Sequence, residues 1–238
     1  MSLFDKPSEV QTAAVDLAIT SRHSIRAFLP TPVSRKTVED ILGIASHAPS
    51  GTNLQPWQVC VLMGQAKERL SERILAIHES PGELASLQEE YDYYPREWVP
   101  PYIDRRRKVG WDLYGLLGIG KTDKAAMHEQ HGRNYRFFGA PVGLIFSIDR
   151  ILAQGSWLDY GMFLQNIMVA ARARGLHTCP QAAFIRFHRV IAEELAFRPG
   201  QMLVCGMAMG FADPSAVENT LVTERVPVAE FARFLVDA

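Results

Sequence analysis

The 238-residue sequence lacks the signals that mark several large classes of protein. Its three cysteines, Cys60, Cys179 and Cys205, lie far apart and form no Cys-x-x-Cys pair, so we expect buried, inert thiols rather than disulfides or metal ligands. No apolar run approaches the ~20 residues of a membrane span. The first residues show no basic start followed by an apolar stretch, so no secretory signal is visible. These absences predict a cytoplasmic protein with reduced thiols.

Charge and catalytic motifs are also sparse. A net charge of −1, with 21% charged residues, gives no electrostatic reason to expect nucleic acid or an anionic membrane as a partner. No Gly-x-Gly-x-x-Gly element is present, so no separate nicotinamide-binding domain is expected. The sequence shows no convincing Ser/His/Asp or Cys/His set and no paired carboxylates. It also shows no metal-binding spacing and no internal repeat.

The length and the 47% hydrophobic content are sufficient for one domain spanning residues 1–238. At least three strand patterns, at 59–63, 142–149 and 202–209, are separated by long helical stretches. This alternation favours a mixed sheet with helices on both faces.

Several helices carry local start and stop signals. Ser8-Glu9-Val10-Gln11 reads as a capping box, and Ser34 is placed to cap a second helix. A third helix is expected from about Ala66 to His78. The longest pattern, 157–174, is apolar around most of its circumference, so we expect it to be buried at the centre or at a subunit interface.

Two polar clusters stand out. Arg22-His23-Ser24-Ile25-Arg26 follows the first helix, and its two arginines and serine could bind a phosphate through charge-assisted hydrogen bonds. Pro49-Ser50-Gly51-Thr52-Asn53-Leu54-Gln55-Pro56-Trp57 lies between a helix, which we expect Pro49 to end, and a strand. Its small polar residues and glycine turn the backbone and leave amides and hydroxyls free for a ligand.

These clusters, in this order and at this separation, resemble the paired motifs of the nitroreductase family of FMN-dependent oxidoreductases. The resemblance continues to Arg225, which matches the family's C-terminal phosphate ligand, whereas Thr223 stands where relatives often carry lysine. The resemblance implies an α+β fold with a mixed central sheet flanked by helices. It also implies an intertwined homodimer with two FMN sites at the interface.

The resemblance further implies which residues hold the cofactor. Arg26 is expected to stabilise negative charge at N1/O2 of the reduced flavin, and Ser50 and Asn53 are expected to come from the partner subunit. Ala182 and Ala183 stand where many relatives have Glu-Gly, which leaves a backbone role at the flavin N5 and O4 edge possible. The implied cofactor-binding set is Arg22, His23, Ser24, Arg26, Pro49, Ser50, Asn53, Pro180, Gln181, Ala182, Ala183 and Arg225.

The implied activity is transfer of hydride from NADH or NADPH, through FMN, to a nitroaromatic or related aromatic acceptor by a ping-pong mechanism. The cofactor carries the redox chemistry, so no catalytic side chain is assigned. The choice among nitro reduction, dehalogenation and another flavin reaction stays open, as does NADH against NADPH. A flavin-binding protein with little turnover is a further alternative.

A different function is suggested by Gly115–Thr122, which satisfies the Walker A pattern of a P-loop nucleoside triphosphatase. Such a loop must follow a buried strand and open a helix. Here the preceding residues Val109, Leu113 and Leu116 recur at helical spacing. The triphosphatase remains the alternative to the flavin enzyme, with Lys121 as its phosphate ligand.

Residues 79–117 combine clustered aromatic side chains with prolines, which is typical either of a lid or of a segment that merely covers the core. The aromatics are Tyr91, Tyr93, Tyr94, Trp98 and Tyr102. The basic run 105–108 is expected on the solvated face of a helix opened by Pro101.

A further helix is expected from Thr122 or Asp123 to about Phe138. On it, His128 and His131 are expected to face solvent, with no acidic ligand nearby, rather than to bind metal. In the family, the turn containing Arg133, Asn134 and Arg136 tends to reach the flavin pyrimidine edge, although the residue types match poorly here. His177 is expected to be structural.

Overall fold

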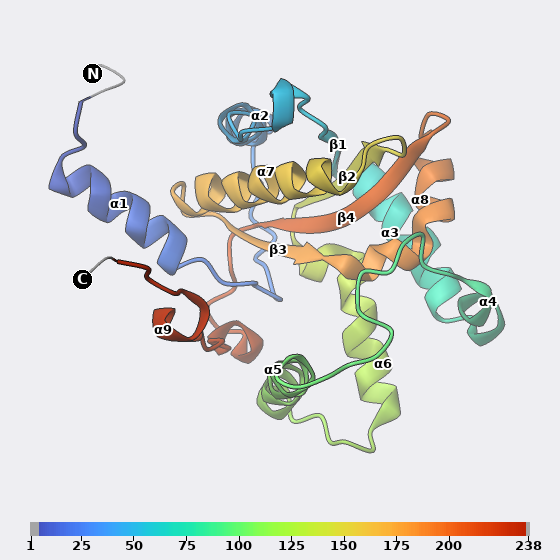
Figure 1. The fold of residues 1–238 in the computed structure, drawn as a ribbon. Coiled ribbons are helices and arrows are strands. Elements are labelled where there is room, and N and C mark those ends of the chain that lie inside the picture. Colours follow the sequence, from blue (N-terminus) through green and yellow to red (C-terminus); the bar gives the residue numbers. More distant parts are fainter. Residues whose placement is uncertain (1–4, 237–238) are drawn as a thin grey trace.

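The computed structural model describes residues 5–236. Its centre is a four-stranded sheet (Figure 1) with strand order β1-β2-β4-β3, in which every neighbouring pair is antiparallel. The strands are β1 (Gln58–Met63), β2 (Val142–Asp149), β3 (His177–Gln181) and β4 (Gln201–Gly210).

The expected α+β class is confirmed, but the expected mixed sheet is wrong in one respect. β2 and β3 run in the same direction and are joined by the crossover helix α7 (Gln154–Arg172). The later strand β4 lies between them and runs the opposite way, so the parallel strands never pair. Within the described residues, parallel pairing occurs only at an isolated bridge between Ser24 and Thr178.

The helix caps predicted from the sequence are present. In α1 (Glu9–Thr20) the Gln11 amide donates to Ser8 Oγ at 3.3 Å, and the Ser8 amide donates to Gln11 Oε1 at 2.8 Å. In α2 (Arg35–Ala45) the Thr37 amide donates to Ser34 Oγ at 3.0 Å. However, α2 ends before Pro49, because the chain has already tightened into a turn closed by the Ala48 amide on Ala45 O at 3.0 Å. The expectation that Pro49 ends the helix is therefore wrong.

The remaining elements surround these. The α-helices are α3 (Gln65–His78), α4 (Pro81–Ser86), α5 (Tyr102–Leu116), α6 (Lys124–Gly132), α8 (His188–Glu194) and α9 (Val228–Phe231). Short 3-10 turns are η1 (Gly51–Asn53), η2 (Arg133–Gly139), η3 (Ala182–Phe187) and η4 (Val217–Thr220). None of the helices within residues 5–236 is long and apolar enough to cross a membrane.

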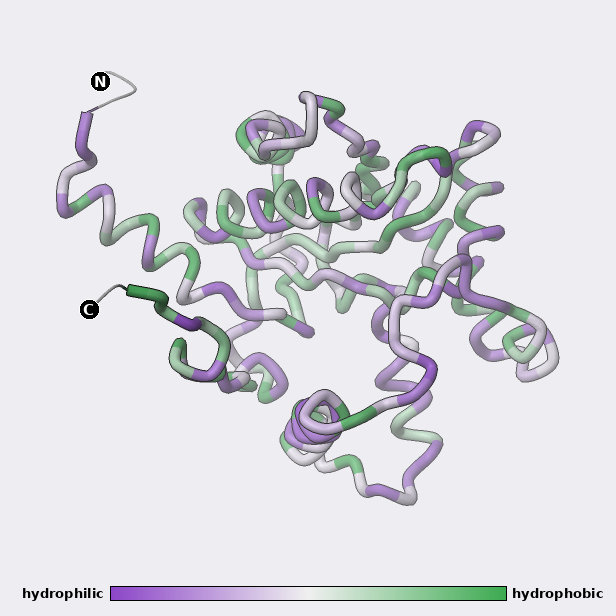
Figure 2. Tube along the Cα trace, in the orientation of Figure 1, coloured by the Kyte–Doolittle hydropathy of each residue, from purple (hydrophilic) through white to green (hydrophobic). Residues whose placement is uncertain are grey.

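Hydrophobic residues pack on both faces of the sheet. Leu144 and Phe146 of β2 join a cluster with α2 and α7 on one face, whereas Ile145 joins a cluster with α3, η2 and η3 on the other. Figure 2 shows the apolar residues following the strands and α7. Both faces of β2 are covered, which explains why its apolar run is continuous and does not alternate with polar residues.

α7 is only partly covered within one chain. Tyr160, Phe163 and Ile167 are buried against the sheet and α2, but Leu158 is 74% exposed and Met162 39% exposed. The expectation that this helix is buried on all sides is therefore not met by a single chain.

The helix expected to reach Phe138 ends at Gly132 and continues as the 3-10 turn η2. Phe137 and Phe138 adopt left-handed backbone angles, with φ of 51° and 54°, and both side chains are buried. The Phe137 ring fills the space above Gly143, where a Cβ would come within 2.7 Å of it. Core packing of these two rings thus breaks the helix.

Candidate functional site

A small hollow of about 130 Å³ lies at the end of α1. It is called the arginine hollow here, and it is lined by Arg22, His23, Ser24, Arg26, Leu221, Thr223 and Arg225. Its three guanidinium groups have no carboxylate partner within residues 5–236. Burial, together with the nearby Arg225, lowers the pKa of Arg22. A site with three cations and no counter-ion suits a multiply charged anion such as a phosphate.

Side-chain clamps hold the arginine hollow in shape. The amides of Arg26 and Ala27 donate to Asn219 Oδ1 at 2.8 and 3.2 Å. Asn219 Nδ2 in turn donates to the carbonyls of Ala27 and Asp213 at 2.8 and 2.9 Å. All the hydrogen-bonding capacity of this one side chain thus joins the N-terminal motif to the C-terminal segment.

Arg133 also holds the backbone at Arg26 in place. It donates to the Arg26 carbonyl at 3.0 Å and forms an ion pair with the buried Glu218. These contacts give Arg133 a positioning role in the turn that, in the family, tends to reach the flavin pyrimidine edge. Of the other two candidates, Asn134 lines the neighbouring cavity and Arg136 is exposed.

The arginine hollow adjoins a larger cavity of about 690 Å³, called the wide cavity here, because Arg26 lines both. The other walls come from β3 and η3, from α6 and η2, and from the segment between α4 and α5. Its lining includes Leu84, Glu89, Tyr93, Tyr94, Arg106, His78, His128, His131, Asn134, Pro180, Gln181, Ala182, Ala183 and Arg186.

The segment Pro180–Ala183 forms an edge between the wide cavity and a third cavity of about 400 Å³ that contains Tyr91 and Trp157. Gln181 Nε2 donates to the Asn134 carbonyl at 2.8 Å, while its buried Oε1 has no partner among the described residues. Neither Ala182 nor Ala183 has a positive φ, so the missing glycine causes no strain. Gln181 therefore anchors this edge to η2 and does not present its side chain to a ligand.

The loop after α2 is tightly wound. The Gly51 amide donates to Asp159 Oδ2 of α7 at 3.1 Å, and the Gln55 amide donates to Ser50 Oγ at 3.0 Å. Thr52, Asn53 and Gln55 have φ of 49°, 62° and 49°, conformations that cost ~1 kcal/mol or more each outside glycine.

Of this loop's expected ligands, Pro49, Ser50 and Asn53 line neither the arginine hollow nor the wide cavity. One chain does not bring the two polar clusters together.

The first half of the segment between α4 and α5 is fixed to β4. The Leu203 amide donates to the Glu90 carboxylate at 3.1 Å, and the Tyr91 hydroxyl donates to the Val204 carbonyl. The pairing of β2 with β4 shifts register between Phe146 and Ser147, leaving Val204 as the extra residue of a bulge. Tyr91 thus satisfies backbone that the sheet leaves unpaired.

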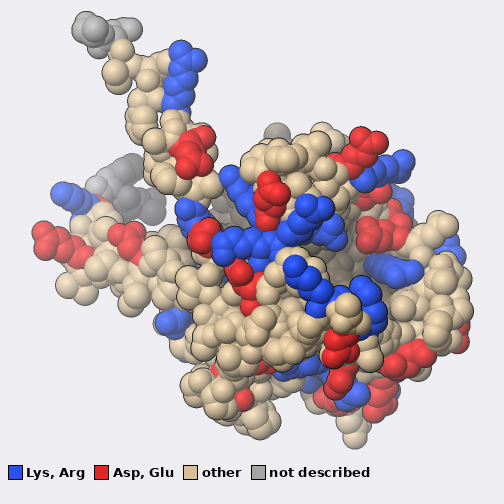
Figure 3. All heavy atoms as spheres, turned by 90° about the horizontal axis from the view of Figure 1, so that it is seen from below, with Lys and Arg blue, Asp and Glu red and all other residues tan. Residues whose placement is uncertain are grey.

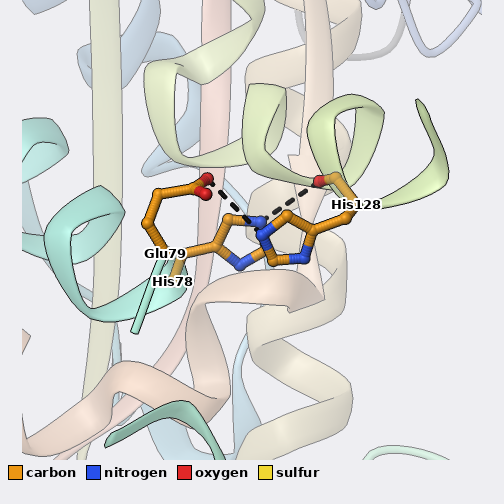
Figure 4. A group of neighbouring side chains, drawn as sticks. All are labelled: His78, Glu79 and His128. Atoms are coloured by element: carbon orange, nitrogen blue, oxygen red, sulfur yellow. Dashed lines mark hydrogen bonds and ion pairs between the residues drawn. The ribbon is translucent and has the colours of Figure 1, made fainter. Parts of the chain in front are cut away.

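A histidine group lies at the edge of the wide cavity (Figure 4). The His78 and His128 rings stack with centroids 3.9 Å apart and planes 5° apart, and Glu79 lies 3.4 Å from His128 Nε2. The expectation that no acidic side chain accompanies these histidines is wrong, because α3 brings Glu79 from a distant part of the sequence. Parallel stacked rings direct their nitrogen lone pairs along separate planes, and His78 Nε2 contacts the His128 carbonyl at 3.1 Å. The three side chains place one ligand atom each within 4.8 Å of one another, but the stacked rings and the contact with the His128 carbonyl fit metal coordination poorly.

The structure contradicts the triphosphatase alternative. The Walker-like residues Gly115–Thr122 continue directly from α5, so a helix and not a strand leads into them. Lys121 Nζ lies 5.2 Å from the centroid of the Trp111 ring. The lysine is thus part of a surface cation–π contact rather than a phosphate-binding loop.

The three cysteines are free thiols, as predicted. Burial raises the pKa of Cys179 to about 11 and that of Cys205 to about 12. Cys60 is half-buried and its pKa is also raised by burial. None is activated as a nucleophile. The expected structural role of His177 fits a side chain whose pKa is lowered by burial, by Arg172 and by His23.

Comparison with known proteins places this arrangement in a family. The chain is 44% identical over 220 residues to the 4-nitrobenzoate reductase of Pseudomonas putida, covering 92% of this chain and 95% of the relative. It is 40% identical over 221 residues to the chloronitrobenzene nitroreductase of Comamonas testosteroni, covering 93% and 96%.

Solved structures of nitroreductases are also similar to this chain. The FMN- and NADPH-dependent nitroreductase NfnB from Sphigopyxis sp. strain HMH superposes with a TM-score of 0.90 at 38% identity, covering 94% of this chain and 99% of that one. The NfnB from Mycobacterium smegmatis, solved in complex with NADPH, gives a TM-score of 0.89 at 28% identity, covering 95% and 100%. The nitroreductase family model matches residues 19–211. This chain therefore belongs to the nitroreductase family.

Proposed function

We propose that the chain is an FMN-dependent oxidoreductase that uses NADH or NADPH to reduce nitroaromatic or related aromatic acceptors. The observation that carries the proposal is the arginine hollow, which opens at Arg26 onto the wide cavity. A cation-lined hollow joined to a roomy, partly aromatic cavity suits a ligand with a phosphate at one end and a flat ring system at the other. The relatives named as nitroreductases support the same reading.

The residues fit FMN in two places. Arg22, His23, Ser24 and Arg225 would hold its phosphate, since they surround the small hollow without a competing carboxylate. The Thr223 hydroxyl, which stands where relatives often have lysine, accepts from Arg225 at 2.7 Å and so orients that guanidinium.

The ring system would lie along Pro180, Gln181, Ala182 and Ala183. Gln181 is buried and donates to the Asn134 carbonyl, so its side chain would hold this edge in place beside the ring. Arg26, placed between the two cavities, would face the pyrimidine edge.

When bound, the flavin accepts hydride from NAD(P)H and delivers electrons to the acceptor. The protein contributes a fixed positive charge at Arg26, which favours the negatively charged reduced ring. The segment 79–117 lines one side of the wide cavity, and we propose that it acts as a lid that borders the acceptor and excludes water. Nicotinamide and acceptor would use one place in turn, as a ping-pong mechanism requires.

The functional unit is proposed to be an intertwined homodimer. Ser50 and Asn53 would reach the flavin of the partner subunit, which accounts for their distance from the hollows of their own chain. Large apolar side chains also lie uncovered on α1, α7 and the C-terminal segment: Val10, Leu17, Leu158, Phe231 and Phe234 are 79%, 64%, 74%, 68% and 77% exposed. Figure 1 shows α1 and the C-terminal segment standing off the sheet. A second copy would cover them.

Sedimentation of the FMN-loaded protein tests the dimer. We expect a dimer that loses FMN as it is diluted to monomer. A compact monomer that retains FMN tightly would contradict it. One domain over 1–238 and a cytoplasmic location are part of the same proposal.

The activity is tested with the purified protein. We expect visible flavin absorption and oxidation of NADH or NADPH that depends on an added nitroaromatic. Absorption without turnover across several acceptors would favour a flavin-binding protein with little activity, and a colourless protein that does not take up FMN would reject the proposal.

A further inference from the structure

The charges that line the wide cavity are one-sided. Glu89 is the single carboxylate among its lining residues. Against it stand three guanidinium groups, from Arg26, Arg106 and Arg186, while the imidazoles of His78, His128 and His131 line the cavity as polar groups.

Arg106 projects from α5 onto an aromatic wall. Its Cζ lies 4.7 Å from the centroid of the Trp98 ring and 5.7 Å from that of Tyr94. No carboxylate within residues 5–236 pairs with it, whereas its neighbour Lys108 contacts Asp112 at 2.8 Å. The run 105–108 is exposed, as expected of a solvated face, and Arg106 in addition lines the cavity.

Arg186 lines the same cavity from η3. It is half-buried and donates to the Leu84 carbonyl, again with no carboxylate partner among the described residues. The ring of Phe184 lies against Gly206, where a Cβ would come within 2.4 Å of it, so η3 is fixed on β4. Arg186 is thus a half-desolvated cation on a firm support.

Figure 3 views the molecule from the side of α5 and α6 and shows lysine and arginine side chains across the middle of this face, with several acidic side chains among them. The phosphate of the proposed cofactor would be bound by the separate arginine hollow, so it does not neutralise Arg106 or Arg186. The wide cavity keeps two cations for another ligand.

From these contacts we infer that the wide cavity selects acceptors that carry an anionic group, specifically a carboxylate on the aromatic ring. The inference rests on the proposed nitroreductase function. Tyr93 and Tyr94 offer aromatic surface for the acceptor ring, and Arg106 and Arg186, which line the same cavity, supply the cations for the carboxylate. A guanidinium matches a carboxylate through two parallel hydrogen bonds, which a neutral substituent cannot reproduce.

The test compares 4-nitrobenzoate with its neutral analogue of the same size, 4-nitrobenzamide. The wild-type enzyme should have the higher kcat/KM for 4-nitrobenzoate. Arg106→Ala should lower the ratio of the two kcat/KM values roughly five- to tenfold, mainly through KM, because it removes one charge-assisted contact in an open cavity. Turnover of 4-nitrobenzamide should change little, so a general folding defect cannot mimic the result.

Matched variants sharpen the measurement. Arg107→Ala removes the adjacent cation on α5, which does not line the wide cavity, and should leave the ratio unchanged. Arg186→Gln should lower the ratio in the same direction as Arg106→Ala, with the exposed Arg189→Gln as its control. Added salt should reduce the ratio in wild type and have less effect in Arg106→Ala.

Equal kcat/KM values for the two acceptors in wild type, or a ratio untouched by both Arg106→Ala and Arg186→Gln, would overturn the inference while leaving the reductase intact. A change confined to the preference for NADPH over NADH would also overturn it, by assigning the cations to the 2′-phosphate of the reductant. Failure of the wild type to reduce either acceptor would instead reject the proposed function, and this inference with it.

Discussion

The arginine hollow and the wide cavity share Arg26 but are built in different ways. Around the small hollow, Asn219 and Arg133 fix the backbone through direct hydrogen bonds between segments far apart in sequence. The outer wall of the wide cavity comes from residues 79–117, where Tyr93 and Tyr94 are exposed and Arg106 is held by ring contacts. The first arrangement suits one ligand of fixed shape, and the second suits ligands that differ from one reaction to the next.

The largest expected effect comes from breaking the clamp. Asn219→Ala removes four hydrogen bonds and leaves the amides of Arg26 and Ala27 without their partner. Partly buried groups left unpaired should lower the free energy of unfolding by about 2–4 kcal/mol. Urea denaturation and FMN titration measure the two consequences.

The control for the clamp is Thr220→Ala in the same turn, whose hydroxyl bonds only the Val217 carbonyl at 2.7 Å. It should cost less than about 1 kcal/mol. Equal losses in the two variants would show that Asn219 has no special part in shaping the hollow.

Removing one charge from the arginine hollow should act on the cofactor rather than on the fold. Arg225→Ala should weaken FMN binding roughly tenfold, since one charge-assisted contact is lost at a site that is exposed in a single chain. The amount of FMN retained after gel filtration measures this, with Lys121→Ala as the control. Unchanged retention in Arg225→Ala would remove Arg225 from the phosphate site.

A change at the wide cavity should instead alter the preference among acceptors and leave FMN binding unchanged. Trp98→Ala removes the ring beneath Arg106, so preference among acceptors should shift roughly two- to fivefold while FMN content stays constant. Trp111→Ala is the control, because the cation on Trp111 is Lys121, which does not line the wide cavity, whereas the cation on Trp98 is Arg106, which does. Identical acceptor profiles for Trp98→Ala and wild type would make residues 79–117 a cover rather than a lid.

The smallest effect is expected from pH. Burial, with the neighbouring His78 and His128, lowers the pKa of His131, and burial also lowers that of His177. The unfolded chain therefore binds these protons more readily, so stability should be full above pH ~6.5 and should fall as pH drops below it. Urea denaturation of wild type and His131→Gln at several pH values tests this. If the free energy of unfolding depends on pH equally in both proteins, the pH dependence arises from other groups.

Local sequence signals predicted much of this molecule. The caps of α1 and α2, the extents of β1 and β4, and the residues of the arginine hollow are encoded in short stretches with their own periodicity or charge. The contacts that could not be predicted join distant positions: Arg26 with Asn219, 193 residues apart, and His78 with His128, 50 apart. No periodicity relates such pairs, because only the packing of α6 and the C-terminal segment brings them together.

The same reasoning explains where local patterns fall short. Arg106 and Lys108 are both exposed, as expected of the basic run, yet Arg106 also lines a cavity whereas Lys108 pairs with Asp112, since 3.6 residues per turn place them on different sides of α5. Phe137 and Phe138 follow a helical pattern, but the cost of two left-handed residues is offset by burying both rings in the core.

The insertion of β4 between β2 and β3 also dictates when the chain can fold during synthesis. Until residues 201–210 have left the ribosome, β2 can pair only with β1, and β3 has no partner strand among the described residues. The nascent chain therefore carries open strand edges for most of its translation, a state prone to association with other chains. The sheet is completed in one late step, in which β4 pairs with both β2 and β3.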